Sequence, residues 1–199
     1  MSKFTTMALI LAGALYAGDL DQALQLLREG KASEAAAQAK SEVDANPDNA
    51  RAREVLGLAL LGQQKTDEAE ESLNKAVELA PDSASAQVGI ARVAMERKQL
   101  DRAQEALNKA EGIDGGNAQV KIYKGALQLA RKDNSGAIKT LEDAVASAPD
   151  EPYGHYYLGL AYYNQKRPDK TVTQFQRFLA IAPGAPEAAR VSSLLRSIR

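Results

Sequence analysis

Cysteine and tryptophan are absent from the 199-residue chain, and histidine occurs once, at position 155. The absence of cysteine excludes disulfide bonds, thiolate metal sites, catalysis by a thiol and lipid attachment through cysteine. One histidine cannot build a multi-histidine metal centre, and we expect His155 to make a polar contact at the surface or in the groove rather than to catalyse. Aromatic residues make up only 5% of the chain, which favours a helical fold over a strand-rich one.

Neither sign of charge dominates, because 25 lysines and arginines stand against 26 aspartates and glutamates. The formal net charge of −1 lacks the basic excess that binding of nucleic acid requires, so we expect no nucleic-acid partner. With 45% hydrophobic and 26% charged residues, the composition is that of a globular protein. The chain is long enough for one or two ordinary domains.

The sequence repeats itself every 34 residues. Small residues recur at this spacing at Ala35, Ala69, Ala103 and Ala137. Helix-breaking residues recur at the same spacing, and we therefore divide the chain into five repeats, 16–49, 50–83, 84–117, 118–151 and 152–185. The breakers are Pro47, Pro81, Gly115, Pro149 and Pro183.

Each repeat carries two amphipathic helices separated by a short polar break. In the second repeat the apolar residues of 51–63 predict the first helix, and Ala69, Leu73 and Ala76 share one face of the second. A side chain that can cap a helix stands near the start of every second helix, at Ser33, Asp67, Asp101, Ser135 and Asp169. The small alanines indicate that the two helices of a repeat approach each other closely.

This pattern resembles the tetratricopeptide repeat (TPR) family, whose helix pairs stack into a right-handed superhelix. The family's Leu-Gly pair in the first helix is matched at Leu56-Gly57 and Leu158-Gly159. The fifth repeat departs from the pattern, because Thr171 and Phe178 replace two alanines of its second helix. The resemblance implies an all-α fold, an α-solenoid of five 34-residue helix-turn-helix repeats over residues 16–185, followed by a C-terminal capping helix over 186–199.

No arrangement of residues indicates catalysis. The sequence has no nucleophile elbow, no phosphate-binding glycine loop and no paired histidines on a helix. The adjacent carboxylates Glu70-Glu71 and Glu142-Asp143 point in different directions on a helix and cannot act as an acid/base pair. We therefore expect a protein that is not an enzyme and that has no catalytic residue, no metal and no cofactor.

Residues 1–15 form an apolar leader with two interpretations. One lysine precedes an uncharged stretch, and Ala12-Gly13-Ala14 fits the small-x-small rule of signal cleavage. An export signal would make the protein extracytoplasmic, either periplasmic or secreted. A retained N-terminal helix is the alternative, and the protein would then be cytoplasmic. The stretch is too short for a stable membrane span, which needs about 20 residues.

The resemblance implies a partner on the concave surface that the first helices form. In the family, the second, fifth, ninth, twelfth and thirteenth residues of each repeat line this surface. The lysine–asparagine clamp with which some relatives hold acidic tails is missing here, and most of these places are apolar or aromatic. We therefore expect the groove to bind an apolar or amphipathic segment of a protein or peptide. The predicted partner-binding residues are Leu24, Leu58, Leu61, Val88, Arg92, Met95, Ile122, Leu129, Tyr153, Tyr156, Leu160 and Tyr163.

Five of the seven tyrosines lie in the fifth repeat, at positions 153, 156, 157, 162 and 163. We expect two or three of them to fill the core beside Phe175 and Phe178, and the others to serve as interface anchors.

The charge distribution supports an alternative function. From the first repeat to the last, the repeats carry 3 basic against 7 acidic residues, 4 against 7, 5 against 5, 5 against 5 and, with the closing helix, 7 against 2. A solenoid that is negative at one end and positive at the other suits head-to-tail contacts between copies. The alternative is thus a self-assembling structural protein that forms homo-oligomers or filaments.

Overall fold

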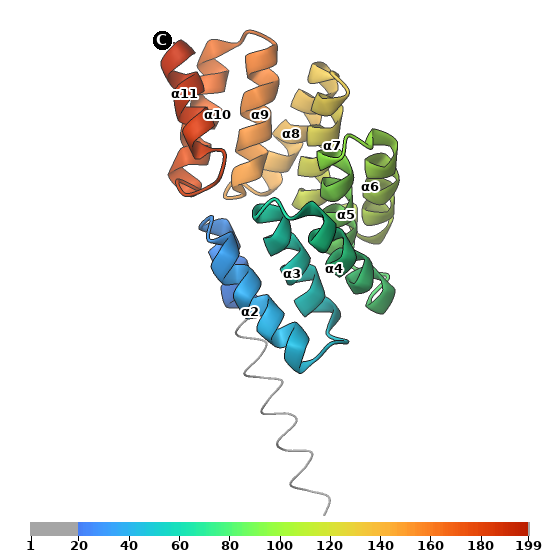
Figure 1. Cartoon of the computed structure of the whole chain (residues 1–199). Helices are drawn as coiled ribbons and strands as arrows, with labels where there is room; N and C mark the ends of the chain where they lie inside the picture. Colours follow the sequence, from blue (N-terminus) through green and yellow to red (C-terminus); the bar gives the residue numbers. More distant parts are fainter. Residues whose placement is uncertain (1–19, 199) are drawn as a thin grey trace, which may run out of the picture. The chain divides into compact units, whose positions relative to one another are not determined.

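The computed structural model describes residues 20–198, and every regular element in this part of the chain is a helix (Figure 1). The apolar leader that the sequence predicts over residues 1–15 lies outside the described residues. A helical segment over residues 20–28 comes first. It is followed by α2 (Ala32–Ala45), α3 (Ala50–Gly62), α4 (Thr66–Leu79), α5 (Ala84–Glu96), α6 (Leu100–Asp114), α7 (Ala118–Ala130), α8 (Asn134–Ser147), α9 (Pro152–Asn164), α10 (Pro168–Ile181) and α11 (Ala188–Ile198).

The helices alternate as the sequence predicts. The first helices α3, α5, α7 and α9 begin at residues 50, 84, 118 and 152, which are 34 apart. Each packs against the second helix that follows it, α4, α6, α8 and α10, and α11 packs against α10. The predicted all-α solenoid of helix pairs with a C-terminal capping helix is confirmed.

The described chain divides at Pro81 into two compact units. Unit 1, residues 20–81, contains the segment 20–28 and helices α2 to α4, and α3 packs against both α2 and α4. Its core is built largely from small side chains, among them Ala23, Ala35 and Ala39, all without exposed surface.

Unit 2, residues 82–198, contains three helix pairs and α11. The first helices α5, α7 and α9 contact one another in order, so they form one layer of the unit. Ala103 in α6 and Ala137 in α8 have no exposed surface, and neither has Ala69 in unit 1. This confirms that the small residues allow close approach of paired helices.

The glycine of the family motif has the same mechanical role. A Cβ on Gly57 would lie 2.5 Å from Cγ of Leu73, and a Cβ on Gly159 would lie 2.5 Å from Cδ1 of Phe175. Gly125 has the same relation to Leu141. In each pair the missing side chain of the first helix makes room for a large side chain of the second.

The predicted caps of the second helices are wrong, because Ser33, Asp67, Asp101, Ser135 and Asp169 each occupy the second position of their helix. The carboxylates among them still stabilise the helix, since its first turn carries a partial positive charge. Of the five residues that precede the second helices, only Asp133 uses its side chain as a cap, accepting from the backbone N–H of Gly136 at 2.9 Å.

The turn between the two helices of a repeat contains a residue in the left-handed backbone region. This residue is Gly30 in the first repeat, with φ of 79°. In the next four repeats it is Gln64, Lys98, Lys132 and Lys166, with φ of 62°, 59°, 65° and 54°. Glycine adopts this conformation freely, whereas a residue with a Cβ is strained by about 1 kcal/mol or more.

Replacing a strained lysine by glycine should therefore stabilise the protein. We expect Lys132→Gly to raise the free energy of unfolding by up to about 1 kcal/mol, measured by urea titration. The control is Lys139→Gly, within helix α8, where glycine should lower the free energy of unfolding by about 1 kcal/mol. A lower free energy of unfolding in Lys132→Gly than in the wild type would show that the backbone at Lys132 is not strained.

Candidate functional site

The predicted partner-binding residues belong to both units. Leu24, Leu58 and Leu61 lie in unit 1 and are half-buried there. Leu24 packs against the core of that unit. The other nine residues lie on the first helices α5, α7 and α9 of unit 2.

Three of these nine do not line an accessible surface. Val88, Ile122 and Tyr156 are buried, with exposed fractions of 4%, 0% and 6%. Each is the fifth residue of its repeat, and in unit 2 the side chain at this position lies in the core. The family pattern alone did not distinguish this position from the accessible ones.

The remaining six are accessible to different degrees. Tyr163 is the most exposed, at 41%, and the other five are half-buried. We call these six residues of α5, α7 and α9, together with the half-buried Tyr157, the aromatic face. Its residues are Arg92, Met95, Leu129, Tyr153, Tyr157, Leu160 and Tyr163.

A chain of ring contacts runs through the aromatic face. The guanidinium carbon of Arg92 lies 5.2 Å from the ring centre of Tyr123, and the ring of Tyr123 meets that of Tyr157 edge-on at 5.9 Å. Tyr157 in turn lies 6.3 Å from Tyr153 and 5.1 Å from the buried Tyr156. These contacts join α5, α7 and α9, because edge-to-face rings and a cation over a ring attract each other.

Sequence reasoning missed Tyr123 and Tyr157 as parts of this network. Both occupy the sixth position of their repeat, 34 residues apart, so their equivalence was visible in the repeat. It also missed Glu187, which accepts a hydrogen bond from the hydroxyl of Tyr153 at 3.2 Å. This bond ties α9 to the segment that precedes the capping helix α11.

Two of the five tyrosines of the fifth repeat are buried, as expected, but only one of these two lies beside Phe175 and Phe178. Tyr156 is buried beside Phe175 and Phe178 in one cluster, and Tyr162 is buried in another with Leu158 and Leu141. His155 is also buried, and its Nε2 donates to the backbone carbonyl of Pro149 at 2.9 Å while its Nδ1 lies 2.7 Å from the side-chain oxygen of Gln174. The predicted surface or groove location of His155 is therefore wrong, because its ring is buried and its polar contacts lie within the fold.

Burial changes the acidity of the tyrosines. It raises the pKa of Tyr157 well above the usual value and, together with the carboxylate of Glu187, raises the pKa of Tyr153. Burial also raises the pKa of Tyr162 to about 12, and the hydrogen bond that Tyr162 donates to Glu142 acts in the same direction.

These shifts predict a loss of stability in alkali. The folded protein holds the phenolic protons more tightly than the unfolded chain, so unfolding releases protons at high pH. The free energy of unfolding should then fall as the pH rises from about 10, the ordinary tyrosine value, toward the pKa of Tyr162 at about 12. Urea titrations between pH 8 and pH 11 measure this slope. Tyr162→Phe should make it shallower, and an unchanged slope would contradict the shift of Tyr162.

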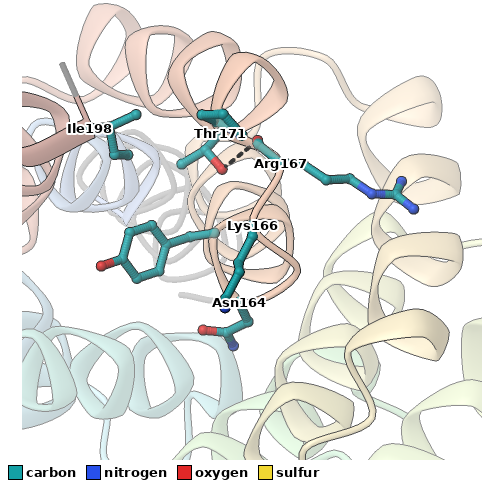
Figure 2. Close-up of a pocket in the computed structure, with 7 residues that line it drawn as sticks. Asn164, Lys166, Arg167, Thr171 and Ile198 are labelled. Atoms are coloured by element: carbon teal, nitrogen blue, oxygen red, sulfur yellow. Dashed lines mark hydrogen bonds between the residues drawn. The ribbon is translucent and has the colours of Figure 1, made fainter.

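A pocket of about 570 Å³ opens where α9 ends and α10 begins (Figure 2). Tyr163, Asn164 and Lys166 line it from the end of α9 and the turn, and Ile198 lines it from α11. The side chain of Arg167 extends away from Ile198 in Figure 2 and lies over the ring of Tyr162, with 6.0 Å between its guanidinium carbon and the ring centre. Arg167, Pro168 and Thr171 also line the pocket, which therefore combines an aromatic ring, aliphatic groups and the cationic side chains of Lys166 and Arg167.

Within residues 20–198, no cluster of histidine, cysteine, aspartate or glutamate has the make-up of a metal site. No helix among these residues has both the length and the apolar character to cross a membrane.

The alternating, packed helix pairs of the described chain define a helical-repeat solenoid. A family profile described as tetratricopeptide repeat matches residues 20–84 and 124–186, and a second profile of the same description matches residues 60–127. The chain therefore belongs to the tetratricopeptide repeat family. The family fold is a protein–protein interaction scaffold, and its members are generally not enzymes. No curated protein sequence matches the chain.

Solved structures share this fold at low sequence identity. The thermophilic TPR protein TTC0263 of Thermus thermophilus matches 92% of this chain and 98% of its own, with a TM-score of 0.74 and 20% identity. A chain of the APC/C hetero-tetramer Cut9-Hcn1 matches 88% of this chain with a TM-score of 0.73 and 19% identity, and this chain spans 35% of its length. MamA (41-end) from Desulfovibrio magneticus RS-1 matches 84% of this chain and 93% of its own, with a TM-score of 0.53 and 19% identity.

Proposed function

We propose that the aromatic face of unit 2 binds a segment of another protein through apolar and aromatic side chains. The single observation that carries this proposal is Tyr163, which is 41% exposed, lines a pocket and lies on the same helix, α9, as the half-buried Tyr153 and Tyr157. Tyrosine is a favoured interface anchor, because its ring buries a large apolar area while its hydroxyl keeps a polar partner.

The face is held in place before a partner arrives. The ring contacts hold Tyr157 against Tyr123 of α7 and Tyr153 against Phe178 of α10, and the hydrogen bond to Glu187 fixes the hydroxyl of Tyr153. Side chains that are already ordered lose little conformational freedom on binding, which favours affinity. The aromatic face is therefore suited to a partner that inserts apolar side chains between fixed rings.

Tyr163 and Ile113 allow a matched test, since both are large exposed hydrophobic residues, at 41% and 39%. Tyr163 belongs to the aromatic face on α9, whereas Ile113 lies on the second helix α6. Panning a random-peptide display library on the wild type should enrich apolar and aromatic peptides. We expect Tyr163→Ala to weaken the selected peptides on the order of tenfold and Ile113→Ala to leave their affinity unchanged. Equal effects of the two substitutions would place the binding surface elsewhere.

Self-assembly is the second candidate function, and the charges of the two units support it. Residues 1–81 carry 8 basic against 13 acidic residues, a net charge of −5, and residues 82–199 carry 17 against 13, a net charge of +4. Opposite charges attract most strongly at low ionic strength. Light scattering should then show oligomers at low salt that dissociate at high salt, and a monomer at every salt concentration would remove this candidate.

A further inference from the structure

In each helix pair of unit 2, a hydrophobic residue in the last turn of the first helix is followed, three residues later, by a lysine in the turn between the two helices. The backbone N–H of Lys98 donates to the carbonyl of Met95 at 2.9 Å, that of Lys132 to Leu129 at 2.9 Å, and that of Lys166 to Tyr163 at 3.0 Å. Met95, Leu129 and Tyr163 belong to the aromatic face, so each lysine follows a residue of that face by three positions along the chain. We call Lys98, Lys132 and Lys166 the lysine ridge.

The lysines of the ridge occupy positions where glycine would fit without strain. All three have positive φ, and the equivalent residue of the first repeat is Gly30. Strained backbone conformations persist where the surrounding structure holds them, and they cluster at functional sites. The property that the three ridge residues share, and that Gly30 and Gln64 of unit 1 lack, is a positive charge.

These charges are available to a partner. The three ridge lysines are exposed, and no ion pair within residues 20–198 engages them. The nearby arginines differ in this respect. Arg131 is bound to the carboxylate of Asp101 at 2.9 Å, and Arg167 lies over the ring of Tyr162.

The pocket in Figure 2 brings a charge of the ridge together with apolar groups, because Lys166 lines it with Tyr163 and Ile198. We propose that the partner segment is acidic as well as apolar. Its apolar side chains pack on the aromatic face, and its carboxylates pair with the lysine ridge. This inference rests on the proposed function and adds the charge of the partner. The ridge lies in the turns between paired helices, outside the first-helix positions at which some relatives clamp acidic tails.

The test compares two variants with the same change in charge. The ridge variant carries Lys98→Gln, Lys132→Gln and Lys166→Gln, and the fold tolerates glutamine in this turn because Gln64 occupies it in unit 1. The control variant carries Lys109→Gln, Lys139→Gln and Arg196→Gln, at exposed positions of α6, α8 and α11. The same random-peptide library is panned on the wild type and on both variants.

Peptides selected on the wild type and on the control should be apolar with an excess of aspartate and glutamate, whereas those selected on the ridge variant should be apolar without that excess. A selected acidic peptide should bind the ridge variant on the order of tenfold more weakly at low salt, and the difference should shrink at high salt.

Other outcomes separate the two proposals. Apolar peptides without charge bias on all three proteins would overturn the acidic partner and leave the proposed function intact. The absence of apolar enrichment on the wild type would overturn both. A third outcome has two parts: the selected peptides show no acidic bias, and phosphatidylglycerol vesicles bind the wild type but not the ridge variant. This outcome would assign the ridge to a membrane surface and overturn the acidic partner.

Discussion

Phe178→Ala should destabilise unit 2 by about 3–5 kcal/mol, although it restores the residue typical of the family. Phe178 stands 34 residues after Ala144 and takes the place that alanine holds in the second, third and fourth repeats. Its side chain has no exposed surface, and its ring lies 5.3 Å from that of Tyr156 and 6.2 Å from that of Tyr153. Alanine would leave a cavity the size of a phenyl ring beneath the aromatic face.

Near-UV circular dichroism during urea unfolding measures this effect, because six of the seven tyrosines lie in unit 2 and there is no tryptophan. The control is Phe178→Leu, which keeps most of the apolar volume and should cost clearly less. Restoring a family-typical residue usually stabilises a protein. A midpoint of unfolding that is equal or higher in Phe178→Ala would show that Phe178 does not support the core beside α11.

The reason for a phenylalanine at this place is the end of the solenoid. Phe178 shares a buried cluster with Val191 of α11, which has no exposed surface. A capping helix must cover the apolar side of the last helix pair, and terminal repeats therefore depart from the family pattern. The sequence predicted both the departure at Phe178 and the closing helix. It did not connect them, because their contact depends on where α11 lies.

The fold was predictable because period and residue size determine it. Ala69, Ala103 and Ala137 are fully buried, as their spacing implied, and the first helices begin 34 residues apart. Helix starts were less predictable. Asp67 and Asp101 have side chains suited to capping, yet the turn geometry places them inside the first turn of the helix and leaves Lys65 and Gln99 at the cap.

The aromatic face was predictable only in part. A position within a repeat tells which residues lie on a first helix, and Arg92, Tyr153 and Tyr163 were found in this way. The depth of a side chain depends on its neighbours on two other helices, which the spacing within one repeat does not describe. The position within the repeat therefore did not reveal that Ile122 and Tyr156 are core residues. It also did not reveal that Tyr123 and Tyr157 form a pair, because their rings meet only through the contact between α7 and α9.

Gly159→Ala and Gly112→Ala should change stability in opposite directions, although both introduce the same methyl group into a helix. At Gly159 the new Cβ would lie 2.5 Å from both Cδ1 and Cε1 of Phe175, a ring with no exposed surface. Overpacking of this kind costs on the order of 1–3 kcal/mol. At Gly112, in α6, no atom lies within 4 Å of the new Cβ. Alanine is the better helix former there and should add about 0.5–1 kcal/mol.

Urea titrations of the two variants under one set of conditions check this prediction, and Gly125→Ala supplies a second overpacked case, since its Cβ would meet Leu141. Intrinsic helix preference alone would stabilise all three variants, because alanine exceeds glycine in a helix interior. Only the close approach of paired helices reverses the sign at Gly125 and Gly159. A gain of stability at either of them would mean that helices α7 and α8, or α9 and α10, separate at little cost, and the glycine at this place of the repeat would then have no packing role.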